Sequence, residues 1–291
     1  MSERVHAVIV NYNSGELLGQ CLDALGASTI EPRVTVVDNA SGDDSLDCLS
    51  RIPADRRPRL VSLPRNLGFA TGVNAGLHDA PEAAWTLLLN PDCLLEHNAL
   101  ALLTEALQED PGAAAAGPLI TNPDGTEQRG CRRRLPDLGS AWRRFLGGGN
   151  AGGDFNLTGT PLPDGPAPVP ALSGACMLVR TDVLLDAGGL DEGYFLHFED
   201  LDLCSTLGRR GWRLLFVPAA RALHWQGTGS SSAPLRVLYH KHRGMYRYTR
   251  RHVIGGGRIW LRPVLASLIT LRFLMLAALT AAGRAGRRDA A

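Results

Sequence analysis

Four short apolar segments, at residues 6–11, 33–37, 59–63 and 85–89, constrain the fold of this chain most strongly. Segments of helical periodicity separate them. Continuous apolar strands that alternate with amphipathic helices are typical of a parallel sheet covered on both faces. We therefore expect an α/β protein with a mostly parallel central sheet flanked by helices. The first intervening helix is predicted from Leu17, Leu18, Cys21, Leu22 and Leu25, which recur on one face.

Polar side chains stand at or just after the ends of these apolar segments. Asn11 closes the first, Asp38 follows the second, Asn66 lies beyond the third and Asp92 follows the fourth. The carboxyl ends of parallel strands meet at one edge of a sheet, and ligands bind in the crevice outside that edge. The sequence therefore predicts a binding site lined by these four residues.

The pattern changes after residue 112. We expect strands at 113–120, 171–180 and 212–217, helices at 181–187, 198–210 and 234–252, and a turn at 122–125. Residues 136–170 are rich in glycine and proline, which predicts a flexible loop.

Charge divides the chain into two parts. Residues 1–204 carry 14 arginines against 28 acids, whereas residues 205–291 carry 15 arginines and one lysine against one acid. A region this basic expects an anionic partner such as membrane lipid or a phosphorylated ligand, and pairing with the acidic body is the alternative. Nucleic acid is not expected, because no recognition motif accompanies the arginines.

An apolar stretch at residues 263–283 lies inside the basic region. Its 21 residues are long enough to cross a bilayer, but Arg272 near the middle costs about 2.5–3.5 kcal/mol on insertion scales. The flanking arginines suit a helix that lies in an anionic interface. The alternative is a buried core helix or a dimer contact.

The six cysteines indicate the redox setting. None forms a Cys-x-x-Cys pair and all lie in apolar segments, so we expect reduced core residues of a cytosolic protein. We expect no secretory signal, because the first apolar segment is short and leads directly into a polar turn.

Three acids interrupt an apolar segment at residues 197–204. Glu199, Asp200 and Asp202 begin a predicted helix, and acids among bulky apolar residues are costly unless they have partners or a function. We assign Asp200 as a general base for a hydroxyl, with Glu199 orienting the hydroxyl-bearing substrate. Asp202 is expected on another face, where the helix dipole favours it. The alternative is that all three are simply acids in a first helical turn.

Asn90-Pro91-Asp92 ends the fourth apolar segment, and His224 begins a polar, glycine-rich segment. The Asp92 carboxylate can hold Mg²⁺ or Mn²⁺, and imidazole is an acceptable ligand for Mn²⁺. A divalent cation at this edge would neutralise a diphosphate. The alternatives are a turn capped by Asp92 and a structural histidine at 224.

Residues 66–76 combine three glycines with two asparagine amides. Gly68 and the amides of Asn66 and Asn74 suit close nucleotide contacts at a helix N-terminus. The segment matches neither a P-loop nor the dinucleotide fingerprint, and tight packing of a helix on the sheet is the alternative. Asp38 can accept hydrogen bonds from a base or a ribose, or instead cap the following helix.

In combination these motifs resemble glycosyltransferase family 2, and within it the bacterial rhamnosyltransferase-like group. The resemblance implies a GT-A fold, a nucleotide-diphosphate sugar donor, a divalent cation (Mn²⁺ or Mg²⁺) and inversion at the anomeric carbon. It covers about residues 5–232 and rests on VIVNYN at 8–13, VVDNAS at 36–41, NLGFA at 66–70, LNPD at 89–92, GACM at 174–177, FEDLDLC at 198–204, and His224 with Gly227 and Ser230.

Carried over motif by motif, the resemblance implies that Asp38 contacts the nucleotide base, that Asp92 binds the metal and that Asp200 is the base. His224 would bind the metal or the diphosphate. Asn90 departs from the usual Asp-x-Asp pattern, although Asn-Pro-Asp looks typical of the rhamnosyltransferase-like branch. The residues expected to bind the nucleotide-sugar are Asn11, Tyr12, Asn13, Asp38, Asn66, Gly68, Asn74 and Asn90.

The expected organisation is a glycosyltransferase domain at 1–232 followed by a basic amphipathic helical tail at 233–291. Residues 1–112 would form the nucleotide-sugar-binding half and residues 113–232 the acceptor half, which contains the 136–170 loop. The expected partners are the donor, a glycan or polyprenyl-diphosphate-linked acceptor, and an anionic membrane surface facing residues 233–288. This places the protein in the cytoplasm, peripheral at the inner face of the cell membrane, and a homodimer is possible.

The expected function is transfer of a sugar from a nucleotide-diphosphate donor, with dTDP-rhamnose favoured, to a hydroxyl of a lipid-linked or cell-envelope glycan. Transfer of another hexose or galactofuranose from a UDP-sugar is the alternative. A nucleotidyltransferase is disfavoured, because the turn at 11–15 has no basic residue to bind a triphosphate. A non-catalytic sugar-nucleotide-binding relative is disfavoured by the presence of Asp92, Asp200 and His224.

Overall fold

The computed structural model describes residues 5–136, 155–225, 234–254 and 256–288. Within these residues, nine strands form one sheet and two short strands form a second, smaller one. The large sheet contains β1 (Val5–Asn11), β2 (Arg33–Asp38), β3 (Arg59–Ser62), β4 (Trp85–Leu89), β5 (Cys93–Leu95), β6 (Ala113–Thr121), β8 (Ala167–Pro168), β10 (Cys176–Arg180) and β11 (Arg213–His224). The small sheet pairs β7 (Arg132–Arg133) with β9 (Ala171–Leu172).

The large sheet is mostly parallel, as the sequence predicts. Its order is β3-β2-β1-β4-β10-β6-β11-β5, with β8 paired to β11. The first four strands of the order are parallel to one another, and β6 is parallel to β11. β10 lies antiparallel between β4 and β6, so it joins the N-terminal half of the sheet to the C-terminal half.

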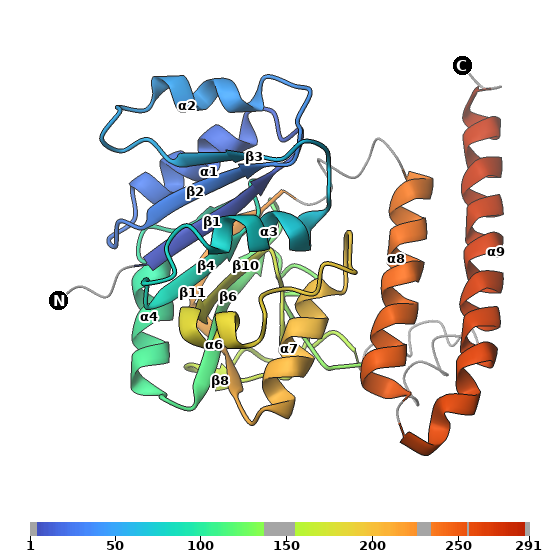
Figure 1. Cartoon of the computed structure of the whole chain (residues 1–291). Coiled ribbons are helices and arrows are strands. Elements are labelled where there is room, and N and C mark those ends of the chain that lie inside the picture. The colour runs from blue at the N-terminus through green and yellow to red at the C-terminus, as the bar shows by residue number, and fades with distance from the viewer. Residues whose placement is uncertain (1–4, 137–154, 226–233, 255, 289–291) are drawn as a thin grey trace.

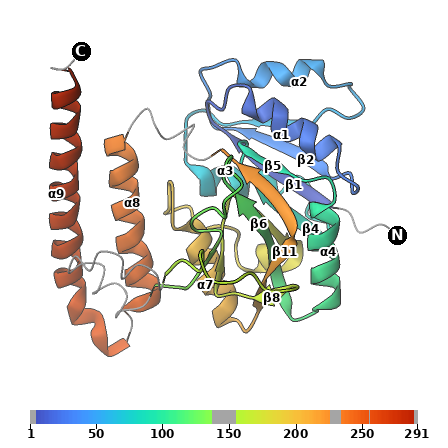
Figure 2. The same cartoon turned by 180° about the vertical axis from the view of Figure 1, so that it is seen from behind.

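Helices cover both faces of the sheet. Figure 1 shows α3 in front of the sheet, and the opposite view in Figure 2 brings α1 to the front. α4 packs against β6 and β11, and α6 packs against β10. The helices are α1 (Leu17–Gly26), α2 (Cys48–Arg51), α3 (Phe69–Leu77), α4 (Ala99–Glu109), α6 (Thr181–Asp186), α7 (Glu199–Arg209), α8 (Pro234–Tyr248) and α9 (Arg262–Arg288), with shorter turns η1 (Ser45–Asp47), η3 (Thr249–Val253) and η4 (Gly256–Leu261).

Two glycines let α3 approach the sheet closely. A β-carbon at Gly72 would lie 2.6 Å from a methyl of Val10, and one at Gly76 would lie 2.6 Å from a methyl of Val8. Close packing leaves no room for an added methyl group. The packing alternative for this glycine-rich segment is therefore correct at these two positions.

Three differences separate the structure from the predicted elements. The strand expected at 212–217 continues to His224, because β11 shifts register against β6 and then pairs with β5. The strand expected at 171–180 is two strands, β9 and β10, in different sheets. β5 and α4 occupy residues at which no strand or helix was predicted. Most of the expected 136–170 loop, residues 137–154, lies outside the described residues, whereas β8 forms within the remainder.

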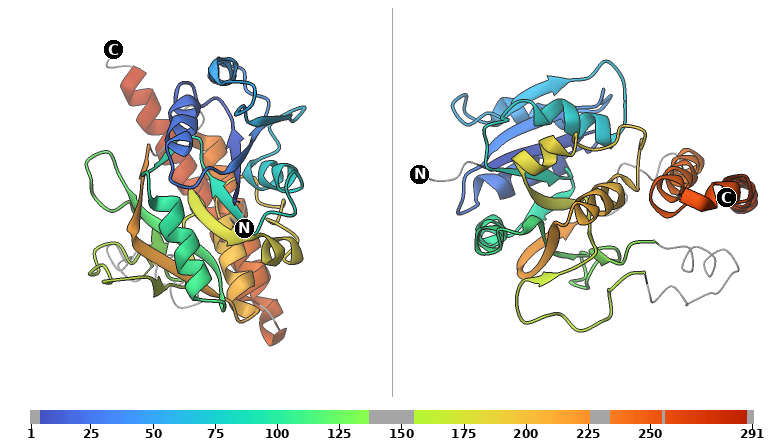
Figure 3. Two further views of the ribbon diagram at one scale, coloured as in Figure 1. Left: turned by 90° about the vertical axis from the view of Figure 1, so that its left-hand side faces the viewer. Right: turned by 60° about the horizontal axis from the view of Figure 1, so that its bottom comes forward.

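The C-terminal helices form a pair beside the sheet domain. α8 lies between α7 and α9, as two views agree (Figures 1 and 3). The end of η4 and most of α9 together form one segment, Ile259–Thr280, that is long and apolar enough to cross a membrane. Only 6% of it is buried. The alternative that residues 263–283 form a buried core helix is therefore wrong.

Arg272 turns its charge away from the apolar surface of α9. Its Nη1 lies 2.9 Å from His242 Nε2 on α8, and His242 Nδ1 donates to the Leu238 carbonyl at 2.8 Å. This tautomer lets Nε2 accept from Arg272. Burial first, and then the neighbouring Arg272 charge, lower the pKa of His242 and keep it neutral. Arg272, whose charge disfavours insertion of this segment into a membrane, thus has a hydrogen-bond partner on α8.

Candidate active site

Asn11 and Asp38 stand opposite each other at the ends of β1 and β2. Asn11 Nδ2 donates to Asp38 Oδ1 at 3.2 Å and to the hydroxyls of Ser41 and Ser45, and Asn11 Oδ1 accepts from Ser14. The Asn11 side chain is fully buried. Asn11 therefore holds the two strand ends and the Asp38 carboxylate together, with its amide committed to protein partners.

The turns beyond β1 and β2 also hold each other. Asn13 Oδ1 accepts the Gly42 N–H at 2.8 Å, and the Asn13 N–H donates to Ser41 Oγ at 3.1 Å. Tyr12, which directly precedes Asn13 in the chain, is half-buried. These residues lie at the predicted edge of the sheet, so their contacts with a donor stay a prediction.

Gly68 and Asn74, both expected to bind the donor, instead contact the segment that precedes α7. Gly68 has φ 94°, and a β-carbon there would lie 2.5 Å from the Phe195 carbonyl oxygen. Asn74 Nδ2 donates to the Leu190 carbonyl at 2.8 Å, and its Oδ1 accepts the Leu190 N–H at 2.9 Å. Asn74 therefore anchors this segment, and its contact with the donor stays a prediction. Asn66 Oδ1 accepts the Gly68 N–H at 3.0 Å and so shapes the same turn.

Asp92 and His224, the predicted metal ligands, lie side by side although 132 residues separate them. His224 Nε2 is 3.0 Å from Asp92 Oδ1, and both side chains are about nine-tenths buried. The end of β11 next to β5 positions His224, because His224 pairs with Cys93, the residue after Asp92. Asn90 Nδ2 lies 3.4 Å from His224 Nε2, so all three predicted residues meet.

Gln128, which the sequence did not single out, fixes the protonation pattern of His224. Gln128 Nε2 donates to Asn122 Oδ1 at 3.1 Å and to the His224 carbonyl at 3.2 Å. With both amide protons used, Gln128 Oε1 accepts from His224 Nδ1, 2.6 Å away. The Nε2 lone pair then faces the Asp92 carboxylate.

This arrangement fits a cation. His224 Nε2 and the Asp92 carboxylate oxygen lie 3.0 Å apart, and a bound cation could take the place of a proton between them. Mg²⁺ and Mn²⁺ sites in proteins use one or two side chains and complete their shell with phosphate oxygens and water. No cluster of three or more metal-ligating side chains occurs in the described part of the chain. Any cation here therefore needs ligands from a bound substrate.

Asp200, the predicted base, begins α7 and is held by groups from three elements. Its Oδ2 accepts from the Arg133 guanidinium on β7 and from the Gly174 N–H at 3.0 Å, and its Oδ1 accepts the Leu201 N–H at 2.7 Å. Burial alone would raise the pKa of Asp200, but the Arg133 charge and these hydrogen bonds outweigh burial and lower it. The carboxylate is therefore ionised at neutral pH.

Glu199 has the opposite environment. Its side chain is 8% exposed, and Oε2 is buried without a hydrogen-bond partner. Burial first, and then the neighbouring Asp200 charge, raise the pKa of Glu199 to about 8. Two adjacent acids thus differ in charge at pH 7, the pattern by which one fold supports distinct acid and base roles.

Asp202, predicted to lie on another face of α7 as an N-terminal charge favoured by the helix dipole, has specific partners in the structure. It is 3% exposed and accepts hydrogen bonds from Tyr194 Oη at 3.0 Å and from His252 Nε2 at 2.6 Å. These partners tie α7 to η3. Asp202 is therefore a buried structural acid, and the sequence could not show this because His252 is distant in the chain.

The segment 128–133 joins the two charged clusters. Gln128 at one end reaches His224, and Arg133 at the other reaches Asp200. The sequence did not point to either residue, because the partner of Gln128 lies 96 residues away in the chain and that of Arg133 lies 67 residues away. The one available signal was the unusual arginine run at 132–134 in the acidic half of the chain.

A family model described as glycosyltransferase like family 2 matches residues 3–246. The chain belongs to glycosyltransferase family 2. This glycosyltransferase is 30% identical, over 94% of its length and 92% of the relative, to an N-acetylglucosaminyl-diphospho-decaprenol L-rhamnosyltransferase of Mycobacterium tuberculosis. It is 27% identical, over 87% of its length and 96% of the relative, to the rhamnosyltransferase WbbL of Escherichia coli. The resemblance inferred from the motifs is confirmed.

Solved structures confirm the fold of this glycosyltransferase. GalNAc-T7 with UDP, GalNAc and Mn²⁺ aligns with a TM-score of 0.64 at 18% identity, over 85% of this chain and 48% of that one. The mannosyltransferase PcManGT from Pyrobaculum calidifontis with GDP-Man and Mn²⁺ aligns with a TM-score of 0.60 at 18% identity, over 97% and 79%. The predicted GT-A fold is therefore correct.

Proposed function

We propose that this glycosyltransferase transfers rhamnose from dTDP-rhamnose to a hydroxyl of a polyprenyl-diphosphate-linked N-acetylglucosamine, with inversion at the anomeric carbon. The observation that carries the choice of sugar and acceptor is the 30% identity, over nearly the whole of both chains, to a relative named for that transfer. A second rhamnosyltransferase at 27% identity supports the same sugar.

Asp200 serves as the general base. Its Oδ2 is occupied by Arg133 and Gly174, whereas Oδ1 accepts one N–H among the described residues and keeps a lone pair for the acceptor hydroxyl. Proton transfer to Oδ1 accompanies attack of the hydroxyl oxygen on the sugar C1. Glu199 keeps its proton at neutral pH and can donate it in a hydrogen bond that orients the acceptor.

Asp92 and His224 would hold Mn²⁺ or Mg²⁺, and Asn90 would contact the same diphosphate. Such a cation, when bound, supplies positive charge to the departing nucleoside diphosphate. Gln128 keeps His224 Nε2 free to act as a ligand. At the neighbouring edge of the sheet, Asp38 binds the nucleoside, and Asn11, Tyr12, Asn13, Asn66 and Gly68 shape the surface around it.

A donor panel tests the proposal. The protein is mixed with dTDP-rhamnose, UDP-galactose, UDP-galactofuranose, UDP-glucose or GDP-mannose, each with Mn²⁺, Mg²⁺ or EDTA, and its melting temperature is measured. Metal-dependent stabilisation by dTDP-rhamnose is expected, since a ligand that binds only the folded state raises its stability. Transfer to a short-chain polyprenyl-diphospho-N-acetylglucosamine is then followed by mass spectrometry. Selective response to a UDP-sugar would instead identify the alternative donor, and stabilisation without transfer to any acceptor would indicate a non-catalytic relative.

We further propose that α8 and α9 hold the protein against an anionic membrane at the inner face of the cell membrane. Large apolar side chains of α9, among them Leu271, Leu274, Met275 and Leu279, are more than half exposed. Residues 205–291 carry 16 basic residues against one acid, which complements an anionic surface. A lipid-linked acceptor would be presented at that surface.

Vesicle co-sedimentation tests this membrane contact. We expect binding to vesicles that contain phosphatidylglycerol, weaker binding to pure phosphatidylcholine vesicles, and loss of binding when Leu271 and Leu274 are both changed to glutamate. A stable dimer in the absence of lipid, abolished by the same two substitutions, would show that a second copy covers the α9 face instead.

A further inference from the structure

The segment between α6 and α7 lies between the start of α3 and the helix α8. Its Phe195 carbonyl accepts the Phe69 N–H at 3.0 Å, next to the close approach to Gly68. On its other side, the Phe195 ring stacks on the His240 ring with centroids 4.1 Å apart, and Arg236 lies over the same ring. One residue therefore connects the edge of the predicted donor site to α8.

The two residues directly before the acids have an unfavourable backbone. His197 has φ 66° and Phe198 has φ 75°. A non-glycine residue keeps such a conformation only where surrounding contacts impose it. Since Glu199 and Asp200 follow at once, whatever imposes this conformation also directs the two carboxyl groups.

Gly244 on α8 packs directly on these two residues. A β-carbon at Gly244 would lie 3.0 Å from the His197 carbonyl oxygen and 3.2 Å from Cδ2 of Phe198. The Phe198 ring also contacts the Tyr248 ring, with centroids 5.9 Å apart. α8 is thus in contact with the strained pair along one turn of its length.

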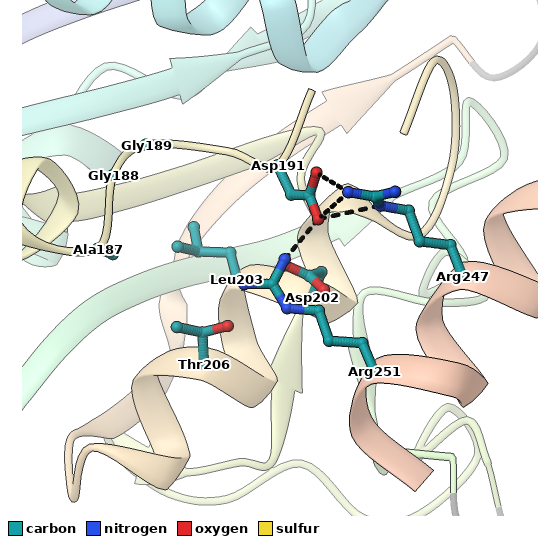
Figure 4. Close-up of a pocket in the computed structure, with 9 residues that line it drawn as sticks. All are labelled: Ala187, Gly188, Gly189, Asp191, Asp202, Leu203, Thr206, Arg247 and Arg251. Carbon is teal, nitrogen blue, oxygen red and sulfur yellow. Dashed lines mark hydrogen bonds and ion pairs between the residues drawn. The ribbon is translucent and has the colours of Figure 1, made fainter. Parts of the chain in front are cut away.

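Ion pairs fasten α8 and η3 to the beginning of the same segment. Arg247 contacts both carboxylate oxygens of Asp191 at 2.7–3.0 Å, and Arg251 also reaches Asp191 (Figure 4). Arg251 lies 3.3 Å from Asp202 on α7 as well. The carboxylates of Asp191 and Asp202 are largely buried, whereas the two arginines are 35% and 44% exposed, so these pairs are partly shielded from solvent.

We propose that α8 is a positioning element of the active centre, in which Gly244 and the Asp191–Arg247 pair hold the segment Asp191–Phe198 so that Glu199 and Asp200 face the acceptor. This inference rests on the proposed transferase function. The family model supports it, because the match continues to residue 246 and so includes most of α8. The C-terminal helices therefore contribute to catalysis in addition to any contact with a membrane.

Gly244→Ala tests the proposal, with Gly208→Ala as the matched control. Both glycines are helical, but a β-carbon at Gly208 meets nothing within 4 Å. Alanine favours a helix over glycine at either site. The added β-carbon requires the His197–Phe198 backbone to shift slightly, so we expect G244A to lower kcat by up to about 10-fold, whereas its melting temperature and its stabilisation by donor stay near wild type. G208A should keep wild-type kcat. Wild-type kcat in G244A would overturn the proposal.

A double-mutant cycle on Asp191→Asn and Arg247→Gln keeps the proposal falsifiable if G244A folds poorly. Each single variant is expected to lower kcat while the KM for donor stays unchanged, and the double variant should be no worse than D191N, which also loses its pair with Arg251. R247K should recover part of the loss. Fully additive effects, or losses in stability alone with kcat unchanged, would overturn the positioning role. An inactive wild-type enzyme that fails the donor panel would instead contradict the proposed function, which separates the two failures.

Discussion

The two charged clusters of the active site are held in different ways. Asp92 and Asn90 follow a central strand, and His224 ends the strand that pairs with β5, so sheet register brings this cluster together. Glu199 and Asp200 follow two residues in a left-handed conformation, on which Gly244 of α8 packs. Register is a property of the backbone and tolerates side-chain changes nearby, whereas a strained segment depends on every contact that imposes it. The position of Glu199 and Asp200 (the acid cluster) should therefore be more sensitive to distant substitutions than that of Asp92 and His224 (the metal cluster).

The largest effect is expected from a substitution within the acid cluster itself. Asp200→Asn should lower kcat by about 10²- to 10⁴-fold, because general base catalysis contributes that much. Stabilisation by dTDP-rhamnose with Mn²⁺ should persist, since the metal cluster is separate. Turnover and donor-induced melting shifts are measured together, with the exposed Asp23→Asn on α1 as control. Full activity in D200N would remove Asp200 as the base.

The next effect addresses the metal cluster. Gln128→Leu removes the acceptor for His224 Nδ1, so the Nε2 lone pair is no longer assured and Mn²⁺ should bind about 10- to 100-fold more weakly. Manganese titration followed by electron paramagnetic resonance, with dTDP present, measures this directly. Gln128→Glu keeps an acceptor oxygen and should bind Mn²⁺ more tightly than Q128L. Equal affinity in Q128L, wild type and the exposed control Q20L would contradict the role of Gln128.

A smaller effect concerns the charge of Asp200. Arg133 lowers the pKa of Asp200 against the effect of burial, so removing Arg133 should raise it. The base is active when ionised, and the acid limb of the kcat–pH profile should therefore move to higher pH in Arg133→Gln. R133K should lie between that variant and wild type. Arg134→Gln, which changes the exposed neighbouring arginine, is the control. Coincident profiles for R133Q and wild type would show that Arg133 does not determine the ionisation of Asp200.

The last expected effect is on stability and not on activity. Glu199 has a pKa raised to about 8 from an ordinary value of 4.5, so the unfolded chain releases this proton first as pH rises. Stability is then full below about pH 4.5 and is lost progressively towards pH 8. Glu199→Gln has no such loss, and its melting temperature should exceed that of wild type by a margin that widens from pH 4.5 to 8. A constant margin, or the same trend in the exposed control E105Q, would show that Glu199 is not the group responsible.

The sequence by itself determined those features of this protein that depend on local, periodic patterns of apolar residues. Strand and helix periodicity predicted the mostly parallel sheet. The polar residues at the ends of β1, β2 and β4 predicted which edge of the sheet carries the site, because the carboxyl ends of adjacent parallel strands lie at the same edge. The motifs also predicted Asp92, His224 and Asp200 as site residues, and the comparisons confirmed the family that these motifs indicated.

Only the tertiary structure decided which of these side chains have partners. Gln128 on His224, Arg133 on Asp200, Asn74 on Leu190 and α8 on the segment before the acids are contacts between residues far apart in the chain. No local pattern encodes such pairs, because each depends on how several elements pack at once. The same packing gives Glu199 and Asp200, adjacent and chemically alike, different charge states at neutral pH: burial keeps Glu199 neutral, whereas Asp200 beside Arg133 is ionised.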